Sequence, residues 1–281
     1  MILQIVLPLR NPSEVLAKTV QSLAEQTSRD FSVLISDNHS TKGTISIASA
    51  VRTLEQHGLN VRVVQPPEEI GRVEHWNWSH RQATADWIKP LFVGDWLETS
   101  YVAALHGAVA SHPQAEIVNC SFASHHADGT RQDTVYPGGF RTPGQVLAEA
   151  FRVGNNFGGP VNVCFRRLAF ECIGGYPPAL PVSADFWVTL MIALRRGLVT
   201  LPEVLAHFHY HPARFSTNFP TSRIDGPREF EVILTAATSW ACFQEIPHDA
   251  TARERLLCGL QSPSWRQKLR RWLRSAFKSK L

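Results

Sequence analysis

Residues 87–97 read Trp-Ile-Lys-Pro-Leu-Phe-Val-Gly-Asp-Trp-Leu. The mostly apolar run is typical of a buried strand, despite the proline near its middle, and it stops at Asp95. The apolar-periodic segment that follows, residues 101–110, predicts a helix with Thr99 or Ser100 as its N-cap. Asp95 is therefore expected at the carboxyl edge of an α/β sheet, where open sheets bind their ligands. The structural alternative is that Asp95 only caps the next turn.

A second acid, Asp37, follows another predicted strand, residues 31–36, and begins a polar turn. Neighbouring parallel strands place their carboxyl ends side by side, so two acids at such ends suit a nucleotide. One can accept hydrogen bonds from a base or ribose, and the other can hold a divalent metal ion. Mg²⁺ and Mn²⁺ commonly use one or two carboxylates together with substrate phosphates, so a single aspartate is enough. Asp37 could also form a local turn with Ser40 and Thr41.

Strand and helix patterns alternate along the first part of the chain, which predicts a mostly parallel sheet with right-handed crossovers. The predicted strands cover residues 3–9, 31–36, 61–64 and 87–95, and the predicted helices cover 11–25 or 13–25, 44–56 and 71–81. The second half is less regular. It has predicted strands at 116–122, 161–165 and 204–211, helices at 142–151 and 186–196, and a loop or short hairpin at 125–143.

The length of 281 residues allows one large α/β domain with an appendage, or two modest domains. No segment has the roughly eighteen uninterrupted apolar residues of a membrane span. The N-terminus has no basic leader and reads as a first strand instead of a signal peptide. The cysteines are scattered without a C-x-x-C pair, which indicates free core thiols in a reducing compartment and neither a disulfide framework nor a zinc site.

The positive charge of the chain is concentrated in its last residues. Seven of the 28 basic residues and none of the 24 acidic residues lie in 262–281, so the basic pI gives no indication of nucleic-acid binding by the body. Apolar residues in this tail recur at helical spacing: Trp265, Leu269, Trp272, Leu273, Ala276 and Phe277. The pattern predicts an interfacial helix on an anionic bilayer, and the alternative is a helix packed on the body or on a partner.

Asp185 opens the predicted helix at 186–196, where an aspartate is a common N-cap. Its neighbours Phe186 and Trp187 could desolvate the carboxyl group and raise its pKa toward that of a useful general base. No Walker loop, G-x-G-x-x-G motif or G-x-S-x-G elbow occurs in the sequence. NAD binding, P-loop chemistry and serine hydrolysis are therefore disfavoured.

Three histidines, His207, His209 and His211, alternate along the last predicted strand and face one side of it. Imidazoles at this spacing can bind a metal ion or a diphosphate. Only one end of such a strand usually reaches a site, so we expect His211 to be functional and His207 to be structural. The pair at 125–126 is expected on the surface.

These pieces, in this order, resemble glycosyltransferase family 2, nucleotide-sugar transferases with the GT-A fold, over about residues 2–216. The matching segments are Val6–Asn11, Ile35–Thr41, Gly71 with Asn77, Leu91–Leu97, Gly174–Tyr176 with Ala184 and Asp185, and Tyr210-His211 with Ser216. The resemblance implies an α/β GT-A (Rossmann-like) fold with a mixed, mostly parallel sheet flanked by helices. We expect this domain at 1–225 and a helical C-terminal extension at 226–281, ending in the basic amphipathic helix 262–281.

The resemblance also implies roles for individual residues. The residues implied around the nucleotide-sugar are Pro8, Asn11, Asp37, Asn77, Gly94 and Asp95. Asp95 and His211 would hold Mn²⁺ or Mg²⁺, Asp37 would bind the base or ribose, and Asp185 would be the general base. Two positions depart from the family pattern, since Gly94 stands where many members carry another acid and Lys42 where an aspartate is common.

The expected function is a metal-dependent, inverting hexosyltransferase that uses a nucleotide-diphosphate donor, a UDP-sugar first of all. Its acceptor would be a hydroxyl of a glycan or lipid-linked molecule in cell-surface polysaccharide or glycolipid synthesis. The predicted tail places the enzyme in the cytoplasm, peripherally bound to the inner face of the cell membrane. The alternative is a catalytically weak or inactive GT-A-like protein that binds a nucleotide-sugar. A nucleotidyltransferase is disfavoured, because residues 9–12 form no glycine-rich basic loop.

Overall fold

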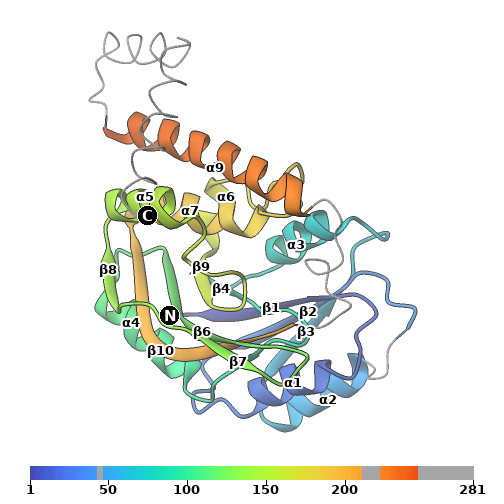
Figure 1. The fold of residues 1–281 in the computed structure, drawn as a ribbon. Coiled ribbons are helices and arrows are strands. Elements are labelled where there is room, and N and C mark those ends of the chain that lie inside the picture. Colours follow the sequence, from blue (N-terminus) through green and yellow to red (C-terminus); the bar gives the residue numbers. More distant parts are fainter. Residues whose placement is uncertain (43–46, 211–221, 246–281) are drawn as a thin grey trace.

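The structure, a computed structural model, describes residues 1–42, 47–210 and 222–245, apart from the side chains of 222–227 and 242–245 (Figure 1). His211, Ser216 and the predicted basic helix at 262–281 therefore lie outside the described residues. Across the described part of the chain, no helix is both long and apolar enough to cross a bilayer.

One mixed sheet forms the centre of the molecule. Its strands are β1 (Leu3–Leu9), β2 (Ser32–Asp37), β3 (Asn60–Val64), β4 (Trp87–Pro90), β5 (Trp96–Leu97), β6 (Ile117–His125), β7 (Arg131–Thr134), β8 (Gly139–Arg141), β9 (Val163–Arg166) and β10 (Leu198–His209). They lie in the order β3-β2-β1-β4-β9-β6-β10-β5, with β7 beside β6 and β8 beside β10. The strands β1, β2, β3, β4, β6 and β10 share one direction, and β9 and β5 oppose it. The predicted mixed, mostly parallel α/β sheet is confirmed.

Helices cover both faces of this sheet (Figure 1). They are α1 (Leu16–Ala24), α2 (Ile47–Gln56), α3 (Arg72–Arg81), α4 (Tyr101–Ser111), α5 (Pro143–Val153), α6 (Arg167–Cys172), α7 (Ala184–Arg196) and α9 (Ser222–Glu245). Side chains alternate between the two faces of a strand, so β1 contributes side chains to a hydrophobic cluster on each face of the sheet. Ile5 and Leu7 pack in the cluster that contains α1, α2 and α4, whereas Val6 packs in the cluster that contains α3, α5, α7 and α9.

The predicted strand at 87–95 is wrong in its second half. β4 ends at Pro90, and the chain then turns, with Asp95 N–H donating to the carbonyl of Phe92 at 3.0 Å. Gly94 has φ +93°, a conformation that interrupts any strand. Asp95 stands directly before β5, a short strand that pairs with β10, and so it remains on the loop that leaves the carboxyl end of β4.

Other predicted boundaries shift as well. Neither Asn11 nor Ser13 caps α1 through its side chain, because α1 begins only at Leu16. The last strand, β10, begins at Leu198 and runs through a bulge near Pro202. The predicted hairpin after β6 is present as β7, and the expected border at 225/226 falls within α9. Cys120 and Cys164 are buried free thiols as expected, whereas the free thiol of Cys172 is exposed.

Candidate active site

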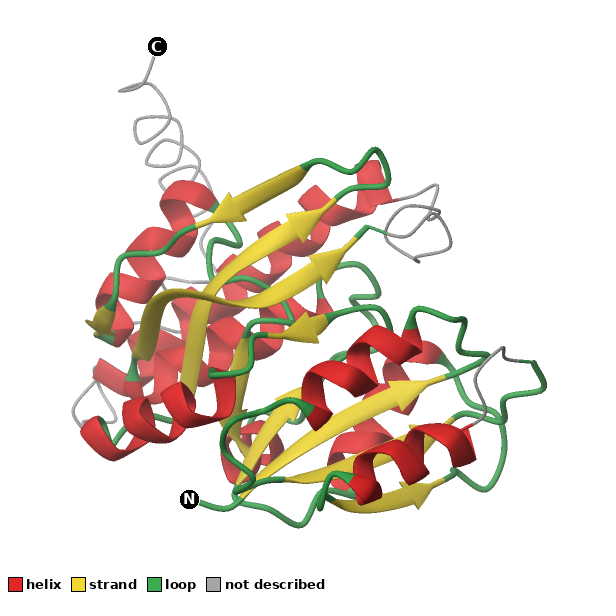
Figure 2. Ribbon diagram, turned by 90° about the horizontal axis from the view of Figure 1, so that it is seen from below, coloured by secondary structure: helices red, strands yellow, loops and turns green. Residues whose placement is uncertain are grey.

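The topology gathers the candidate residues at one edge of the sheet. Asp37 is the last residue of β2, and the Asp95 loop leaves the carboxyl end of β4, a parallel strand that β1 separates from β2. Figure 2 shows the central sheet with the helices and loops around it. The helices α3 and α7 precede the parallel strands β4 and β10, so their N-termini also point to this edge. Arg72 opens α3 and Asp185 lies in the first turn of α7. The carboxyl edge therefore carries Asp37, Asp95, Asp185 and Arg72.

Asp37 forms the local turn with Ser40 that the sequence offered as the alternative to a role in nucleotide binding. Its Oδ1 accepts hydrogen bonds from the Ser40 N–H at 3.1 Å and the Ser40 hydroxyl at 2.5 Å. Its Oδ2 accepts a bond from the Gln65 side chain at 3.3 Å. The carboxylate is nearly buried, and these donors fix it at the end of β2.

Asn11 holds the same turn from the other side. It has a positive φ of 48°, and its side-chain oxygen accepts hydrogen bonds from the N–H groups of Thr41 and Lys42 at 2.8 and 2.9 Å. Its own N–H donates to the Ser40 hydroxyl at 2.8 Å. Pro8, also predicted near the nucleotide, lies in β1 opposite Ser36 of β2. Asn11 thus links the loops after β1 and β2, and the Lys42 side chain is exposed.

Asp95 is almost completely buried, with 1% of its surface exposed. Its Oδ1 accepts a hydrogen bond from the backbone N–H of His209, at the end of β10, at 3.2 Å. The preceding residue, Gly94, donates its N–H to the Thr19 hydroxyl at 3.0 Å. A Cβ at Gly94 would lie 3.3 Å from Val15 Cγ2, in addition to the strain of its positive φ. The loop geometry therefore explains why position 94 carries no second acid.

A histidine metal site is not formed by the described residues, which contain no group of three or more histidine, cysteine or acidic side chains suited to a metal ion. His207 instead bonds Glu98 at 2.6 Å and His125 at 3.1 Å, and its ring stacks on Trp96 at 4.9 Å. These contacts hold its ring inside the protein, and its structural role stays a prediction. The Lys18 side chain also contacts Trp96, with its Nζ 3.2 Å from the centre of the ring.

The carboxylate of Asp95 still suits an implied Mg²⁺ or Mn²⁺. It is a hard oxygen donor, at the sheet edge where a diphosphate would supply further oxygens. His211, the second predicted ligand, lies beyond the described residues. Among the described residues, one carboxylate is therefore available to bind the ion. This is sufficient, because these ions commonly take their other ligands from substrate phosphates and water.

Asp185 lies inside the first turn of α7, two residues after the N-cap Ser183, so it is not itself the N-cap that the sequence predicted. Its Oδ1 accepts the Phe186 N–H at 2.8 Å, and a Cβ on Gly159 would lie 3.3 Å from its Oδ2. Burial raises the pKa of Asp185 above its ordinary value, opposed by the Phe186 N–H and by the positive charge of Arg72. Asp185 is half-buried, and the direction of this shift agrees with the partial desolvation expected from Phe186 and Trp187.

Arg72 is a site residue that the sequence did not single out. Its guanidinium donates to the carbonyl of Pro181 and lies 4.3 Å from the ring of Trp76. Charge attraction to Asp185 partly offsets the lowering of the Arg72 pKa by burial. Just before it, Ile70 exchanges hydrogen bonds with the side chain of Asn38 at 2.8 and 3.1 Å. One short segment thus connects the Asp37 turn to Asp185.

Lys89 makes a second connection, between β4 and the turn beside Asp185. Its ammonium donates to the carbonyls of Pro90, Pro160 and Val161 at 2.6, 2.8 and 2.7 Å. Burial lowers the pKa of Lys89 to about 8, while the nearby charge of Asp95 acts in the opposite direction. The segment that contacts Asp185 is therefore fixed to the strand that leads to Asp95.

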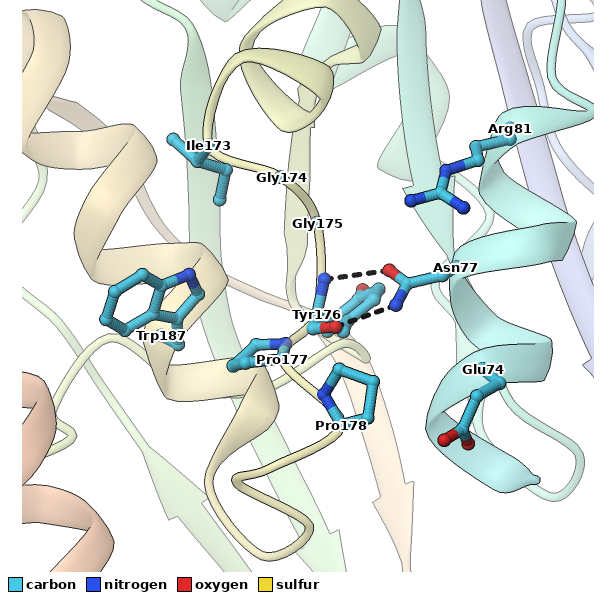
Figure 3. Close-up of a pocket in the computed structure, with 10 residues that line it drawn as sticks. All are labelled: Glu74, Asn77, Arg81, Ile173, Gly174, Gly175, Tyr176, Pro177, Pro178 and Trp187. Carbon is cyan, nitrogen blue, oxygen red and sulfur yellow. Dashed lines mark hydrogen bonds between the residues drawn. The ribbon is translucent and has the colours of Figure 1, made fainter.

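Asn77 occupies a joint between α3 and the turn at 174–176. Its Nδ2 donates to the carbonyl of Tyr176 at 2.7 Å, and its Oδ1 accepts the Tyr176 N–H at 2.8 Å (Figure 3). Gly175 passes so close that a Cβ there would lie 2.5 Å from Asn77 Oδ1, and it has φ +81°. Both polar ends of the Asn77 amide are thus engaged by the protein backbone.

A cavity of about 350 Å³ opens beside this joint, between α3 and the start of α7 (Figure 3). Its walls include the Trp187 ring, Pro177 and Pro178, with Glu74 and Arg81 projecting from α3. Trp187 lies two residues after Asp185, so the cavity and the candidate base belong to the same turn of α7.

Comparison with known proteins finds similar sequences and similar folds. The family described as Glycosyl transferase family 2 matches residues 4–91. A curated relative from Haemophilus influenzae, named as an uncharacterized glycosyltransferase, is 22% identical over 224 residues, which cover 78% of this chain and 72% of that protein.

Two examples represent the solved structures that share this fold. TarS 1-349 of S. aureus, in complex with UDP, has a TM-score of 0.63 and 15% identity over 84% of this chain, which spans 65% of that chain and so less than two thirds of it. The mannosyltransferase PcManGT of Pyrobaculum calidifontis, in complex with GDP-Man and Mn²⁺, has a TM-score of 0.54 and 18% identity over 98% of this chain and 85% of its own.

Proposed function

Because this chain is a glycosyltransferase of family 2 with the GT-A fold, we propose that it transfers a sugar from a nucleoside-diphosphate donor to a hydroxyl group of a glycan or lipid-linked acceptor. The observation that carries this proposal is the arrangement at the carboxyl edge. There, Asp185, whose pKa is raised, shares the edge with Asp37 and Asp95. A UDP-sugar is the first donor to test, and the GDP-Man and UDP complexes of the two similar structures support the nucleotide class.

Each aspartate has a role in this proposal. Asp37, at the end of β2, accepts hydrogen bonds from the base or ribose of the nucleotide, and Asn11 shapes the loop beside it. Asp95 faces the diphosphate and would hold Mn²⁺ or Mg²⁺, an ion that would neutralise charge on the leaving phosphates. Gly94 provides backbone conformation at this loop and Asn77 holds the Tyr176 turn, so both support the nucleotide site through the protein backbone.

Asp185 acts as the general base. Its carboxylate takes the proton of the acceptor hydroxyl as the acceptor oxygen forms a bond to the anomeric carbon. The bond between that carbon and the diphosphate oxygen breaks, and the nucleoside diphosphate leaves with the bonding electrons. A single displacement of this kind inverts the anomeric configuration, as in single-step inverting glycosidases. The raised pKa of Asp185 makes its carboxylate a better proton acceptor than an exposed aspartate.

The cavity beside Asn77 is proposed as the place of one sugar residue of the acceptor. A sugar ring offers an apolar C–H face, which suits the Trp187 ring, and hydroxyl groups, which suit Glu74 and Arg81. Its volume lies at the lower end of the range for small-molecule pockets, about 300–1,000 Å³. The role in cell-surface polysaccharide or glycolipid synthesis, and the location on the inner membrane face through 262–281, are proposals from the sequence.

The test is a panel of UDP- and GDP-sugars with and without Mn²⁺, read by thermal stabilisation and then by hydrolysis of each stabilising donor. A donor present at 100 times its dissociation constant should stabilise the protein by about 2.7 kcal/mol. Donor turnover that Asp185→Asn abolishes while stabilisation persists would support the proposal. Stabilisation by a nucleotide-sugar without hydrolysis or transfer by the unaltered protein would favour the alternative, an inactive nucleotide-sugar-binding protein. A lack of stabilisation by every donor would contradict both.

A further inference from the structure

We propose that Glu229, a residue of the C-terminal helix α9, is a positioning residue for Asp185, because its carboxylate holds the backbone at the start of α7. This proposal rests on the role of Asp185 as general base in the proposed function. Glu229 is separated from Ser183 by 46 positions in the sequence, and it acts on Asp185 through the backbone of the segment that carries it and through its charge.

The carboxylate of Glu229 binds the backbone immediately before the first turn of α7. Glu229 Oε2 accepts the N–H groups of Ser183 and Val182 at 2.7 and 3.1 Å, and its Oε1 lies 3.3 Å from the Val182 nitrogen. Ser183, the N-cap of α7, makes no capping bond of its own, and its hydroxyl has no hydrogen-bond partner among the described residues. A helix N-terminus carries partial positive charge, which a nearby carboxylate stabilises. Glu229 of α9 therefore fixes the N-cap residue of α7 and the residue before it.

The helix that carries Glu229 is itself fixed on α7 and α5. Phe230 stacks on Phe186 with 4.7 Å between ring centres, and it lies close to Gly154 at the end of α5. Ile233 and Ala237 of α9 are completely buried. Asp185 stands between the two anchored positions, Ser183 on one side and Phe186 on the other. A shift of α9 would therefore move the backbone of the candidate base.

Glu229 also contributes charge. It is 7% exposed, and its negative charge adds to burial in raising the pKa of Asp185. The charged and titratable groups that face Asp185 are Arg72 from α3, Glu229 from α9 and Tyr176 from the turn before α7. Arg72 favours the charged carboxylate and Glu229 opposes it. Loss of the Glu229 charge should therefore lower the pKa of Asp185, even if the backbone keeps its place.

The experiment uses the full 281-residue chain in three variants. Glu229→Ala removes both the hydrogen-bond acceptors and the charge, and Glu229→Gln removes the charge but keeps the size and one acceptor. Glu231→Gln makes the same charge change on an exposed residue of the same helix and serves as the control. Hydrogen exchange of the Val182 and Ser183 amides should accelerate at least tenfold in Glu229→Ala and less in Glu229→Gln. Carbon-13 NMR of the aspartate carboxyls, assigned with Asp185→Asn, should show a lower pKa for Asp185 in Glu229→Gln.

The third measurement is the rate of donor hydrolysis. Donor hydrolysis should fall about tenfold or more in Glu229→Ala, and its acidic limb should move to lower pH in Glu229→Gln, with Glu231→Gln unchanged. Unchanged amide exchange and an unchanged Asp185 pKa would overturn the proposal, as would both changes without any effect on hydrolysis. Exchange and NMR need no substrate. If they change as expected while the unaltered protein turns over no donor, Glu229 still positions Asp185 and the proposed function is at fault.

Discussion

Replacement of Asn77 by alanine tests whether this residue supports the fold of the site or contacts the donor directly. Asn77 is 7% exposed and its partner Tyr176 is 2% exposed, and the two are joined by hydrogen bonds of 2.7 and 2.8 Å. The change leaves one buried N–H and one buried carbonyl of Tyr176 without partners. Each unsatisfied buried group costs about 1–3 kcal/mol. The two groups together would cost about 2–6 kcal/mol. Water can enter from the adjacent cavity, so we expect a total in the lower half of this range, about 3 kcal/mol.

Urea and thermal denaturation of the purified variant measure this loss. About 3 kcal/mol corresponds to a fall in Tm of roughly 6–12 °C for a domain near this size. Asn60→Ala, at an exposed position of β3, is the matched control and should change stability by less than about 0.5 kcal/mol. If Asn77→Ala keeps its stability within about 0.5 kcal/mol and instead loses nucleotide affinity, the supporting role is refuted. Asn77 would then contact the donor, as the family resemblance implies.

Four further predictions concern Asp185, Gly94 and the C-terminal tail. Asp185→Asn should lower turnover by roughly 10²–10⁴-fold with donor binding retained, as measured by steady-state kinetics and calorimetry; unchanged turnover would remove its role as base. Because the pKa of Asp185 is raised by folding, its ionisation costs stability as the pH rises from its unfolded value toward the folded one. The same variant should therefore melt higher than the unaltered protein at pH 8 but not at pH 3, and an equal Tm at pH 8 would contradict the burial argument. Gly94→Asp should destabilise by about 1–3 kcal/mol without tightening Mn²⁺ binding, since the loop needs a positive φ; tighter binding at unchanged stability would show that the loop accepts a second acid. Deletion of 262–281 should release the protein from anionic liposomes and leave the body folded with an unchanged Tm, and retained co-sedimentation would exclude the tail as the anchor.

The sequence predicted the frame of the fold well because the frame follows local patterns. The alternation of β1 and the helices between the first strands identified the parallel sheet, and the strand-end position of Asp37 followed from it. The strand predicted at 87–95 was wrong in its second half. An apolar stretch looks the same as strand or as buried loop, and only the pairing partners show that β4 ends at Pro90.

The parts of the site that were missed depend on contacts across long stretches of chain. Arg72 reaches Pro181 over 109 positions, and Glu229 reaches Ser183 over 46. No periodicity or motif records such pairs. Asn77 was found by resemblance, but its two bonds to the Tyr176 backbone could not be inferred from its place in a helix. A buried polar residue in a predicted helix indicates that a partner exists without saying which one.

The way α9 lies on α5 and α7 bears on how this protein can be produced. A shortened chain that stops at residue 225 would lack the apolar stripe that contains Ile233 and Ala237, and it would leave the matching surfaces of α5 and α7 open to water. Uncovered apolar surface of this kind promotes aggregation during synthesis and refolding. A recombinant fragment should therefore extend at least to residue 245 if it is to be purified in a folded form that does not aggregate.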